Sequence, residues 1–442
     1  MGPDGGLLVQ PSWLVDDPSE SPKADWGIRV VGTKVDAVGP NRDLAVDYPD
    51  DEVMDAPDSI LLPGFVNAHV HLYGVLAHGL PTETAPSGFW PFLEDFWWPL
   101  VEDRLDHRML EAAADWVCGE MLRTGTTTFC DVLEAPGTLP DVLPVEKAVV
   151  DRWGLRGVLC FEATERSGTE IGQRGLEENA RFIEACRDDE FVSGMMSIHT
   201  TFSCSDAFIS QAFRLAEEHD VLLHAHCNEG THEGEWCEHH HGRRTVEHYD
   251  YLQVAGPRLL ASQCVHLSDR EKALIAERGV RCAHMPLANC EVGGGIAPVP
   301  ELLDAGVTVG LGSDGYVNDM FEVMRGAFLL HKGRLQDPRV MPAPRVLEMA
   351  TVGGARALGL EGVGCLAPDW SADFQLVDGR FPTPTTAGNL LEQLVLHRSG
   401  QHVEHVMVGG RWVVRDGAAP SGDPEALRAQ LHEQAQRLWG VK

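Results

Sequence analysis

Short apolar segments alternate with amphipathic stretches through the middle of the chain. Eight segments have the length and the aliphatic character of buried strands: residues 64–72, 126–132, 154–163, 194–202, 221–228, 261–267, 279–285 and 306–314. Helical stretches lie between them, for example residues 107–125 and 206–220. This series, over roughly 300 residues, predicts an α/β fold of the (β/α)8 TIM-barrel type. A doubly wound sheet is the competing fold, but it usually carries a glycine-rich phosphate loop after its first strand, where this chain has AHVHLYG.

Both ends of the chain have a different pattern. Residues 26–39 and 51–56 near the start, and residues 372–379 and 403–417 near the end, are short β-like pieces separated by Asp, Pro and Gly. We therefore expect residues 1–62 and 366–442 to form one small β-sandwich domain from both termini, and residues 63–365 to form the barrel.

Charge and composition exclude several classes of protein. The 442 residues include 35 Lys and Arg against 67 Asp and Glu, a formal net charge of −32, which disfavours nucleic acid as a partner. The sequence has no apolar run of the ~18 residues that a membrane helix needs, and it starts without a cationic signal region. The eleven cysteines include no CxxC pair, which indicates buried thiols in a reducing compartment. We expect a cytoplasmic protein; a salt-adapted host is a second explanation of the acidic surface.

Polar residues occur where the predicted strands end, and in a barrel these ends face the active site. His69 and His71 end the first strand, and their spacing of two puts both imidazoles on one side. His226 and Glu229 follow the fifth strand, and Asp314 follows the eighth. Three imidazoles and one carboxylate suit Zn²⁺ or Fe²⁺. The sequence thus predicts a metal site of His69, His71, His226 and Asp314.

Three more histidines lie near the same strand ends. His199 and His266 end the fourth and sixth strands and are expected to face the same mouth. His224 has the strand parity of His226 but lies one pleat deeper, so we expect it to support the site rather than bind the metal. The third and fourth strands contain no lysine that, once carbamylated, could bridge two metals, so one ion is expected.

These motifs together resemble the amidohydrolase superfamily. PGFVNAHVHLYG, LLHAHCNEG, QCVHLSD and LGSDGYVNDM are similar to its branch of aminohydrolases and chlorohydrolases of the ATZ/TRZ type, which includes S-adenosylhomocysteine, guanine and triazine enzymes. SIHTTFSCSD and CEHHHGRRTVEH look most like SsnA-type aminohydrolases within that branch. The resemblance covers nearly the whole chain.

The resemblance implies a role for each matching residue. His69, His71, His226 and Asp314 match the family's metal ligands, with Zn²⁺ favoured and Fe²⁺ as the alternative. Glu229 matches the glutamate that shuttles protons, and His266 and Asp314 match the groups beside the attacking water. His199 matches a substrate-contacting histidine. The implied reaction is hydrolytic deamination of a purine-like heterocycle with release of ammonia. The implied assembly is a homo-oligomer, most simply a dimer.

Two departures from the family pattern bear on the substrate. In the loop where nucleoside-specific relatives carry a ribose-binding Glu beside a Trp, this chain has Pro91 and Phe92; after the seventh strand, where relatives often carry Lys, it has Ala288 and Glu291. Both changes favour a neutral free heterocycle over a nucleoside or a phosphorylated compound. Aromatic residues after the first strand are expected to form a wall for a planar ring: Tyr73, His78, Phe89, Trp90 and Phe92. Of these, we expect Trp90 and Phe92 to contact the substrate.

Alternatives remain at this stage. The same site would also expel chloride or an alkylamine from a triazine-like ring, and a metal-free scaffold protein is the hypothesis from another class. Trp97 and Trp98 are more typical of core packing or a subunit contact than of ring stacking. The run His239, His240, His241 is expected on a solvated helix face, with a second metal site as the lesser option.

Overall fold

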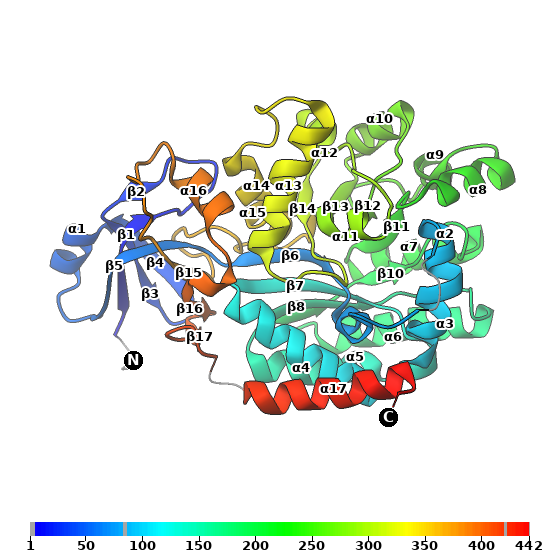
Figure 1. Ribbon diagram of the computed structural model, residues 1–442, viewed down its shortest axis with the longest axis horizontal. Coiled ribbons are helices and arrows are strands. Elements are labelled where there is room, and N and C mark those ends of the chain that lie inside the picture. The colour runs from blue at the N-terminus through cyan, green and yellow to red at the C-terminus, as the bar shows by residue number, and fades with distance from the viewer. Residues whose placement is uncertain (1–4, 83–85, 420–421, 442) are drawn as a thin grey trace.

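The computed structural model describes residues 5–82, 86–419 and 422–441. Two sheets of parallel strands occupy its centre (Figure 1). The first has the order β6 (Phe65–Val70), β7 (Thr126–Leu133), β8 (Arg156–Phe161), β9 (Val192–Gly194); the second has the order β10 (Met196–Ile198), β11 (Leu223–Cys227), β12 (Leu259–Gln263), β13 (Arg281–His284), β14 (Val309–Leu311). Each of the eight predicted strands overlaps an observed strand, and β9 is an additional short strand just before β10. The α/β architecture with parallel sheets is therefore confirmed.

Isolated parallel bridges join the edges of these two sheets. Val70, at the end of β6, pairs with Asp314 beyond β14, and Ala163, beyond β8, pairs with Ile198 in β10. These bridges bring the carboxyl ends of strands from both sheets to one place.

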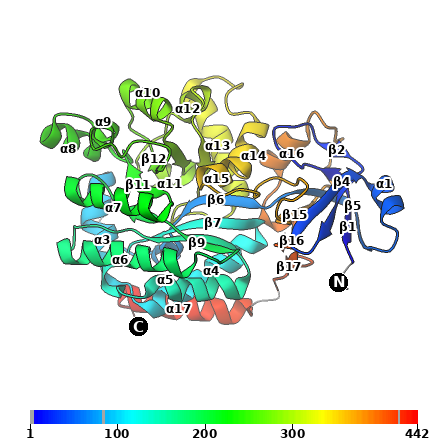
Figure 2. The same ribbon diagram turned by 180° about the vertical axis from the view of Figure 1, so that it is seen from behind.

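Helices cover the outer faces of the parallel strands (Figures 1 and 2). They are α4 (His107–Arg123), α5 (Val142–Trp153), α6 (Thr169–Ala185), α7 (Asp206–His219), α8 (Thr231–His241), α9 (Thr245–Tyr251), α10 (Asp269–Arg278), α11 (Pro286–Glu291), α12 (Val299–Asp304), α13 (Met320–Leu335), α14 (Ala343–Met349), α15 (Val352–Ala357) and α16 (Leu390–His397). Side-chain caps define several starts: Asp106 accepts from the first turn of α4 and Ser205 from that of α7. The predicted helices 107–125 and 206–220 correspond to α4 and α7.

Short helical turns follow β6 and lie above the strand ends. They are η1 (Leu72–Ala77), α2 (Phe89–Pro91), η2 (Phe92–Trp97), α3 (Trp98–Leu100) and η3 (Glu102–Arg104); η4 (Pro136–Thr138) and η5 (Gly400–His402) occur elsewhere. Within η2 the backbone follows a π-helix, a form that often occurs at functional sites.

Both ends of the chain contribute to one further sheet. Its order is β17 (Arg411–Val414), β16 (Val403–Val408), β15 (Phe374–Asp378), β5 (Glu52–Pro63), β1 (Leu7–Leu14), β3 (Trp26–Val31), β4 (Lys34–Pro40), with β2 (Lys23–Ala24) beside β1 and α1 (Asn41–Asp47) after β4. Strand β5 pairs in parallel with β1 and antiparallel with β15, so it joins the two terminal segments.

The last helix lies apart from this sheet. Helix α17 (Pro424–Trp439) runs along α4 at the bottom of Figure 1 and also contacts η1. Trp439 Nε1 donates to the carbonyl of Leu76 over 2.8 Å, and Arg437 forms an ion pair with Asp106 at 2.5 Å. The predicted terminal segment 366–442 thus ends in a helix that packs on the parallel-strand unit. Among the described residues, no helix is long and apolar enough to cross a membrane.

Candidate active site

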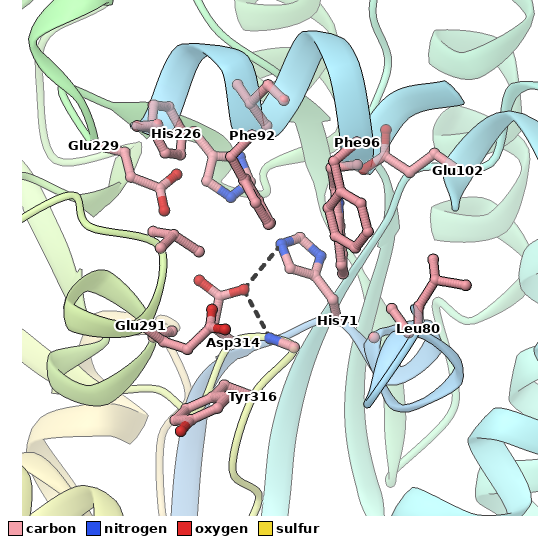
Figure 3. A pocket seen from close by; sticks show the side chains of 18 of the residues that line it. His71, Leu80, Phe92, Phe96, Glu102, His226, Glu229, Glu291, Asp314 and Tyr316 are labelled. Atoms are coloured by element: carbon pink, nitrogen blue, oxygen red, sulfur yellow. Dashed lines mark hydrogen bonds and ion pairs between the residues drawn. The ribbon is translucent and has the colours of Figure 1, made fainter. Parts of the chain in front are cut away.

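The predicted metal ligands lie together at the carboxyl ends of the parallel strands. His69 is in β6 and His71 directly follows it, His226 is in β11, and Asp314 comes shortly after β14. Figure 3 shows His71, His226, Glu229 and Asp314 directed toward one cavity. His69 is fully buried, whereas His71 and His226 keep 7% and 6% exposure at the cavity.

Distances between the ligand atoms fit a single ion. His69 Nε2 lies 3.3 Å from His71 Nε2, and His71 Nε2 lies 3.5 Å from Asp314 Oδ1. Two ligands bound tetrahedrally to zinc at about 2.0–2.1 Å are about 3.3–3.4 Å apart. The rings of His226 and His69 are 5.0 Å apart between centroids and nearly perpendicular, so His226 adjoins the same point from another strand. The donor set, three imidazoles and a carboxylate, is one that zinc accepts.

Each histidine of this cluster has a partner on its Nδ1 atom. His71 Nδ1 donates to the carbonyl of Val132 over 2.5 Å, and His226 Nδ1 donates to Glu162 Oε1 over 2.5 Å. His69 Nδ1 lies 3.1 Å from Ser262 Oγ. The carbonyl of Val132 and the carboxylate of Glu162 only accept, so they fix His71 and His226 in the tautomer that leaves Nε2 as the lone-pair atom, as metal-ligating histidines require.

His224 differs from its neighbour His226 because both of its nitrogens have hydrogen-bond partners. Nδ1 is 2.9 Å from Ser197 Oγ and Nε2 is 2.6 Å from Ser262 Oγ. Burial and the surrounding histidines hold the pKa of His224 well below its usual value. The neutral ring of His224 therefore packs behind His69 and His226.

Asp314 has an unusual backbone and two donors. Its φ angle is +59°, a left-handed conformation that a non-glycine residue adopts only when the surroundings enforce it. The backbone amide of Gly315 donates to Oδ1 over 2.7 Å and Gln263 Nε2 donates to Oδ2 over 2.6 Å. The carboxylate is therefore held with Oδ1 toward His71.

Gln263, rather than His266, is the sixth-strand residue beside Asp314. Nε2 of His266 donates to the carbonyl of Gly294 over 2.6 Å, and this side chain does not line the cavity. Gln263 is 1% exposed, and its Oε1 atom has no hydrogen-bond partner among the described residues. Asp314 is thus held by Gln263, whereas His266 contacts Gly294; the role expected for His266 beside the attacking water stays a prediction.

The cavity above the cluster has a volume of about 350 Å³, within the range of small-molecule sites. His199 and Glu229 line it, as do Ala288 and Glu291. Burial raises the pKa of Glu229 well above the usual carboxyl value, and the nearby carboxylate of Asp314 adds to this effect. A buried carboxyl group with a perturbed pKa at a cavity is a candidate for proton transfer.

Aromatic side chains from α2 and η2 form one wall of the cavity. Phe89, Phe92, Phe96 and Trp97 line it, so the predicted contact Phe92 lies where expected (Figure 3). Trp90 does not line the cavity: its ring stacks on His232 at 3.8 Å, because the helical turn directs it to the opposite side from Phe92. Trp97, expected in core packing, is thus a wall residue, whereas Trp98 makes an edge contact with Trp90.

A buried arginine organises carboxylates behind this wall. Arg166 forms ion pairs with Glu102 at 2.9 Å and with Asp103 at 2.8 Å, and it also contacts Glu134. Glu102, which lines the cavity, accepts from Tyr73 Oη over 2.9 Å. Neither Arg166 nor Glu162 followed from a sequence motif, since each acts through partners distant in sequence.

Comparison with known proteins agrees with this geometry. The model of the family described as "Amidohydrolase family" matches residues 60–413. The chain belongs to the amidohydrolase family. It is 35% identical over 373 residues to a 5'-deoxyadenosine deaminase of Methanothermobacter thermautotrophicus, covering 83% of this chain and 84% of that protein. It is 33% identical over 424 residues to a 5-methylthioadenosine/S-adenosylhomocysteine deaminase of Syntrophobacter fumaroxidans, covering 93% of each.

Solved structures of amidohydrolases superpose on this chain. An adenosine deaminase from Xanthomonas campestris with bound zinc has a TM-score of 0.90 at 25% identity, over 98% of this chain and 99% of the other. The atrazine chlorohydrolase of Arthrobacter aurescens, complexed with zinc, has a TM-score of 0.84 at 23% identity, over 97% and 100% of the two chains. The second likeness establishes the common fold.

Proposed function

We propose that this amidohydrolase is a metal-dependent aminohydrolase that removes the exocyclic amine of a purine-like ring and releases ammonia. The observation that carries the proposal is the cluster of His69 Nε2, His71 Nε2 and the Asp314 carboxylate, with the ring of His226 beside it, at a cavity that Glu229 also lines. The names of the deaminase relatives support the same reaction.

One divalent ion, most simply Zn²⁺, fits the cluster. His69, His71, His226 and Asp314 would hold it, and the Nδ1 partners of the three histidines support their orientation. A divalent ion in such a site supplies a water molecule whose pKa falls from 15.7 to about 7, so that hydroxide is available at neutral pH.

Residues of the chain then carry the proton and hold the water. Glu229, with its raised pKa, takes the proton from the attacking water and delivers it to the ring nitrogen. Gln263 Nε2 holds Asp314 by donating to its Oδ2, and His266 and Asp314 remain the residues proposed beside the attacking water. His199, which lines the cavity at the end of β10, contacts the substrate ring.

We propose a neutral adenine-type compound as the substrate. Among the described residues that line the cavity, none is Lys or Arg, whereas Glu102, Glu229 and Glu291 are present. A phosphate group would therefore meet carboxylates rather than cations. The name of the 5'-deoxyadenosine deaminase relative favours a nucleoside as the substrate, whereas the absence of a carboxylate at Pro91 and Phe92 favours a free base. The substrates to be tested therefore include both classes.

The finer architecture is also a proposal. We propose that β6, β7, β8 and β10–β14 close into a (β/α)8 barrel, which the bridges Val70–Asp314 and Ala163–Ile198 support. We propose that residues 1–62 and 366–442 form the small β-sandwich domain and residues 63–365 the barrel; the sheet built from both termini supports this division, whereas α17 packs on α4.

The test is ammonia release by the zinc-loaded enzyme. The panel contains adenine, guanine, adenosine, 5'-deoxyadenosine, 5'-methylthioadenosine, S-adenosylhomocysteine and adenosine monophosphate. We expect kcat/KM for the best neutral compound to exceed that for adenosine monophosphate at least tenfold, about 1.4 kcal/mol of transition-state binding. A preference for the phosphate, or chloride release from a chlorotriazine without any ammonia release, would refute the proposal.

A further inference from the structure

A second group of metal-binding side chains lies between α8 and α9, outside the residues that line the cavity. Cys237 and His241 are four residues apart on α8, so they lie on the same face of that helix, and His248 comes from α9. One ligand atom of each residue lies within 4.8 Å of the others. Both views of the molecule show α8 and α9 side by side (Figures 1 and 2).

His248 is oriented as a metal ligand would be. Its Nε2 donates to Asp206 Oδ1 over 2.8 Å, and its Nδ1 is buried without a hydrogen-bond partner among the described residues. The side chain of His248 is 1% exposed, so solvent does not satisfy this nitrogen. A carboxylate on one ring nitrogen with a free lone pair on the other is the arrangement found at His226 and typical of zinc-bound histidines.

His241 is the one member of the run 239–241 that turns toward this group. Its ring stacks on that of His248 at 3.9 Å, with 23% of its side chain exposed. Its neighbours His239 and His240 are exposed, and His240 Nδ1 donates to the carbonyl of Trp236. The solvated face expected for the run therefore describes only two of its three histidines.

Cys237 supplies a sulfur ligand. It is fully buried, and burial raises the pKa of its thiol to about 12, so it remains protonated in the absence of a cation. Soft thiolate with two imidazoles is a donor set that zinc and cobalt prefer.

We propose that Cys237, His241 and His248 Nδ1 bind a second transition-metal ion, Zn²⁺ in the first instance, at a site separate from the active site. When the metal–sulfur bond forms, the thiol proton leaves to solvent. Tetrahedral sulfur and nitrogen ligands of zinc are about 3.6 Å apart, so small side-chain rotations close the group around the ion. Water completes the coordination on the exposed side of His241.

The ion would link α8 to α9. Helix α8 begins two residues after Glu229, and its Glu233 accepts hydrogen bonds from the backbone amides of Asn228 and Thr201. The site therefore anchors the helix that follows the catalytic loop, and its role is structural.

Cobalt distinguishes this site from the active site, because only this one offers a thiolate. The metal-free enzyme is titrated with Co²⁺ while the near-ultraviolet thiolate-to-cobalt absorption is recorded. We expect the band to saturate within two equivalents of Co²⁺, one for each site, to vanish in Cys237→Ser, and to require at least tenfold more Co²⁺ in His241→Gln and His248→Gln.

Matched controls separate the site from adventitious binding. Cys290→Ser removes the one exposed cysteine and His239→Gln removes an exposed histidine of the same helix, and both should keep the band. His241 is partly exposed, so its variant tests the proposal even if Cys237→Ser folds poorly. The proposal is overturned if the native enzyme gives no band, if the band survives in Cys237→Ser, or if His239→Gln weakens Co²⁺ binding as much as His241→Gln.

Discussion

Removing the carboxylate behind His226 should weaken metal binding without touching any ligand. Glu162 Oε1 accepts a short hydrogen bond of 2.5 Å from His226 Nδ1. Both side chains are buried, so the contact is shielded from water. Partners of this kind typically contribute 10–100-fold to metal affinity, about 1.4–2.7 kcal/mol. Glu162→Gln keeps an acceptor for Nδ1 but removes the charge, whereas Glu162→Ala removes both.

The expected order of zinc affinity is native, then Glu162→Gln, then Glu162→Ala, with the alanine variant at least tenfold below the native enzyme. Burial raises the pKa of Glu162 well above its usual value, so protonation removes the charge behind His226 as the pH falls. Zinc affinity of the native enzyme should therefore fall more steeply toward acidic pH than that of Glu162→Gln.

Competition with a zinc chelator measures both effects. Glu165→Gln is the matched control, because Glu165 lies on the same loop and accepts from Ser205 rather than from a ligand histidine. Affinities within threefold of native for both Glu162 variants would refute the reasoning, because His226 would then need no carboxylate partner.

Three further predictions concern the proton shuttle Glu229, the amide of Gln263 that contacts Asp314, and the buried carboxyl pair of Glu146 and Asp131. Glu229→Gln should keep the metal but lose roughly 10²–10⁴-fold in kcat, since Gln cannot accept a proton; near-normal turnover would assign the shuttle to another group. Gln263→Leu should lower zinc affinity and kcat at least tenfold, because the lost hydrogen bond to the charged Asp314 contributes about 1.5–3 kcal/mol. Gln375→Leu, in the terminal sheet, is the control and should lower stability alone. Buried Glu146 faces Asp131, and its pKa is raised well above 4.5, so native stability should fall as the pH rises from the usual carboxyl pKa through that raised pKa; urea unfolding of Glu146→Gln should lack this loss.

Strand periodicity predicted the parts of the site that lie on regular strands. His69, His71 and His226 follow from the rule that alternate residues share a face, and Asp314 from its place after an apolar run. The same rule explains why His224 lies behind His226. The placement of these residues could therefore be derived before any coordinates were known.

The same rule fails where the backbone leaves the pleat. Gln263 and Cys264 both have positive φ angles, +72° and +51°, so the chain turns before it reaches His266. His266 comes after this turn and contacts the carbonyl of Gly294, whereas Gln263, the last residue of β12, contacts Asp314. The expectation that Trp90 and Phe92 face the same side meets a related difficulty. A helical turn, rather than an extended loop, sets the direction of the Trp90 side chain.

Long-range partners had no local signature. Glu162 and His226 are 64 residues apart, and Arg166 joins Glu102 across the same separation. Such pairs form only when the fold brings the ends of separate strands and loops to one place. The sequence shows Glu162 after an apolar run but does not show its partner.

The path of β5 has a consequence for synthesis on the ribosome. One edge of β5 pairs with β1 at once, but its other edge waits for β15, roughly 310 residues later in the chain. At about 5–20 residues per second, that edge is open for roughly 15–60 s while the rest of the chain emerges. An unpaired strand edge invites pairing with other nascent chains. Strand β5 also continues directly into the strand of His69, so a misplaced partner on β5 would disturb the metal site itself.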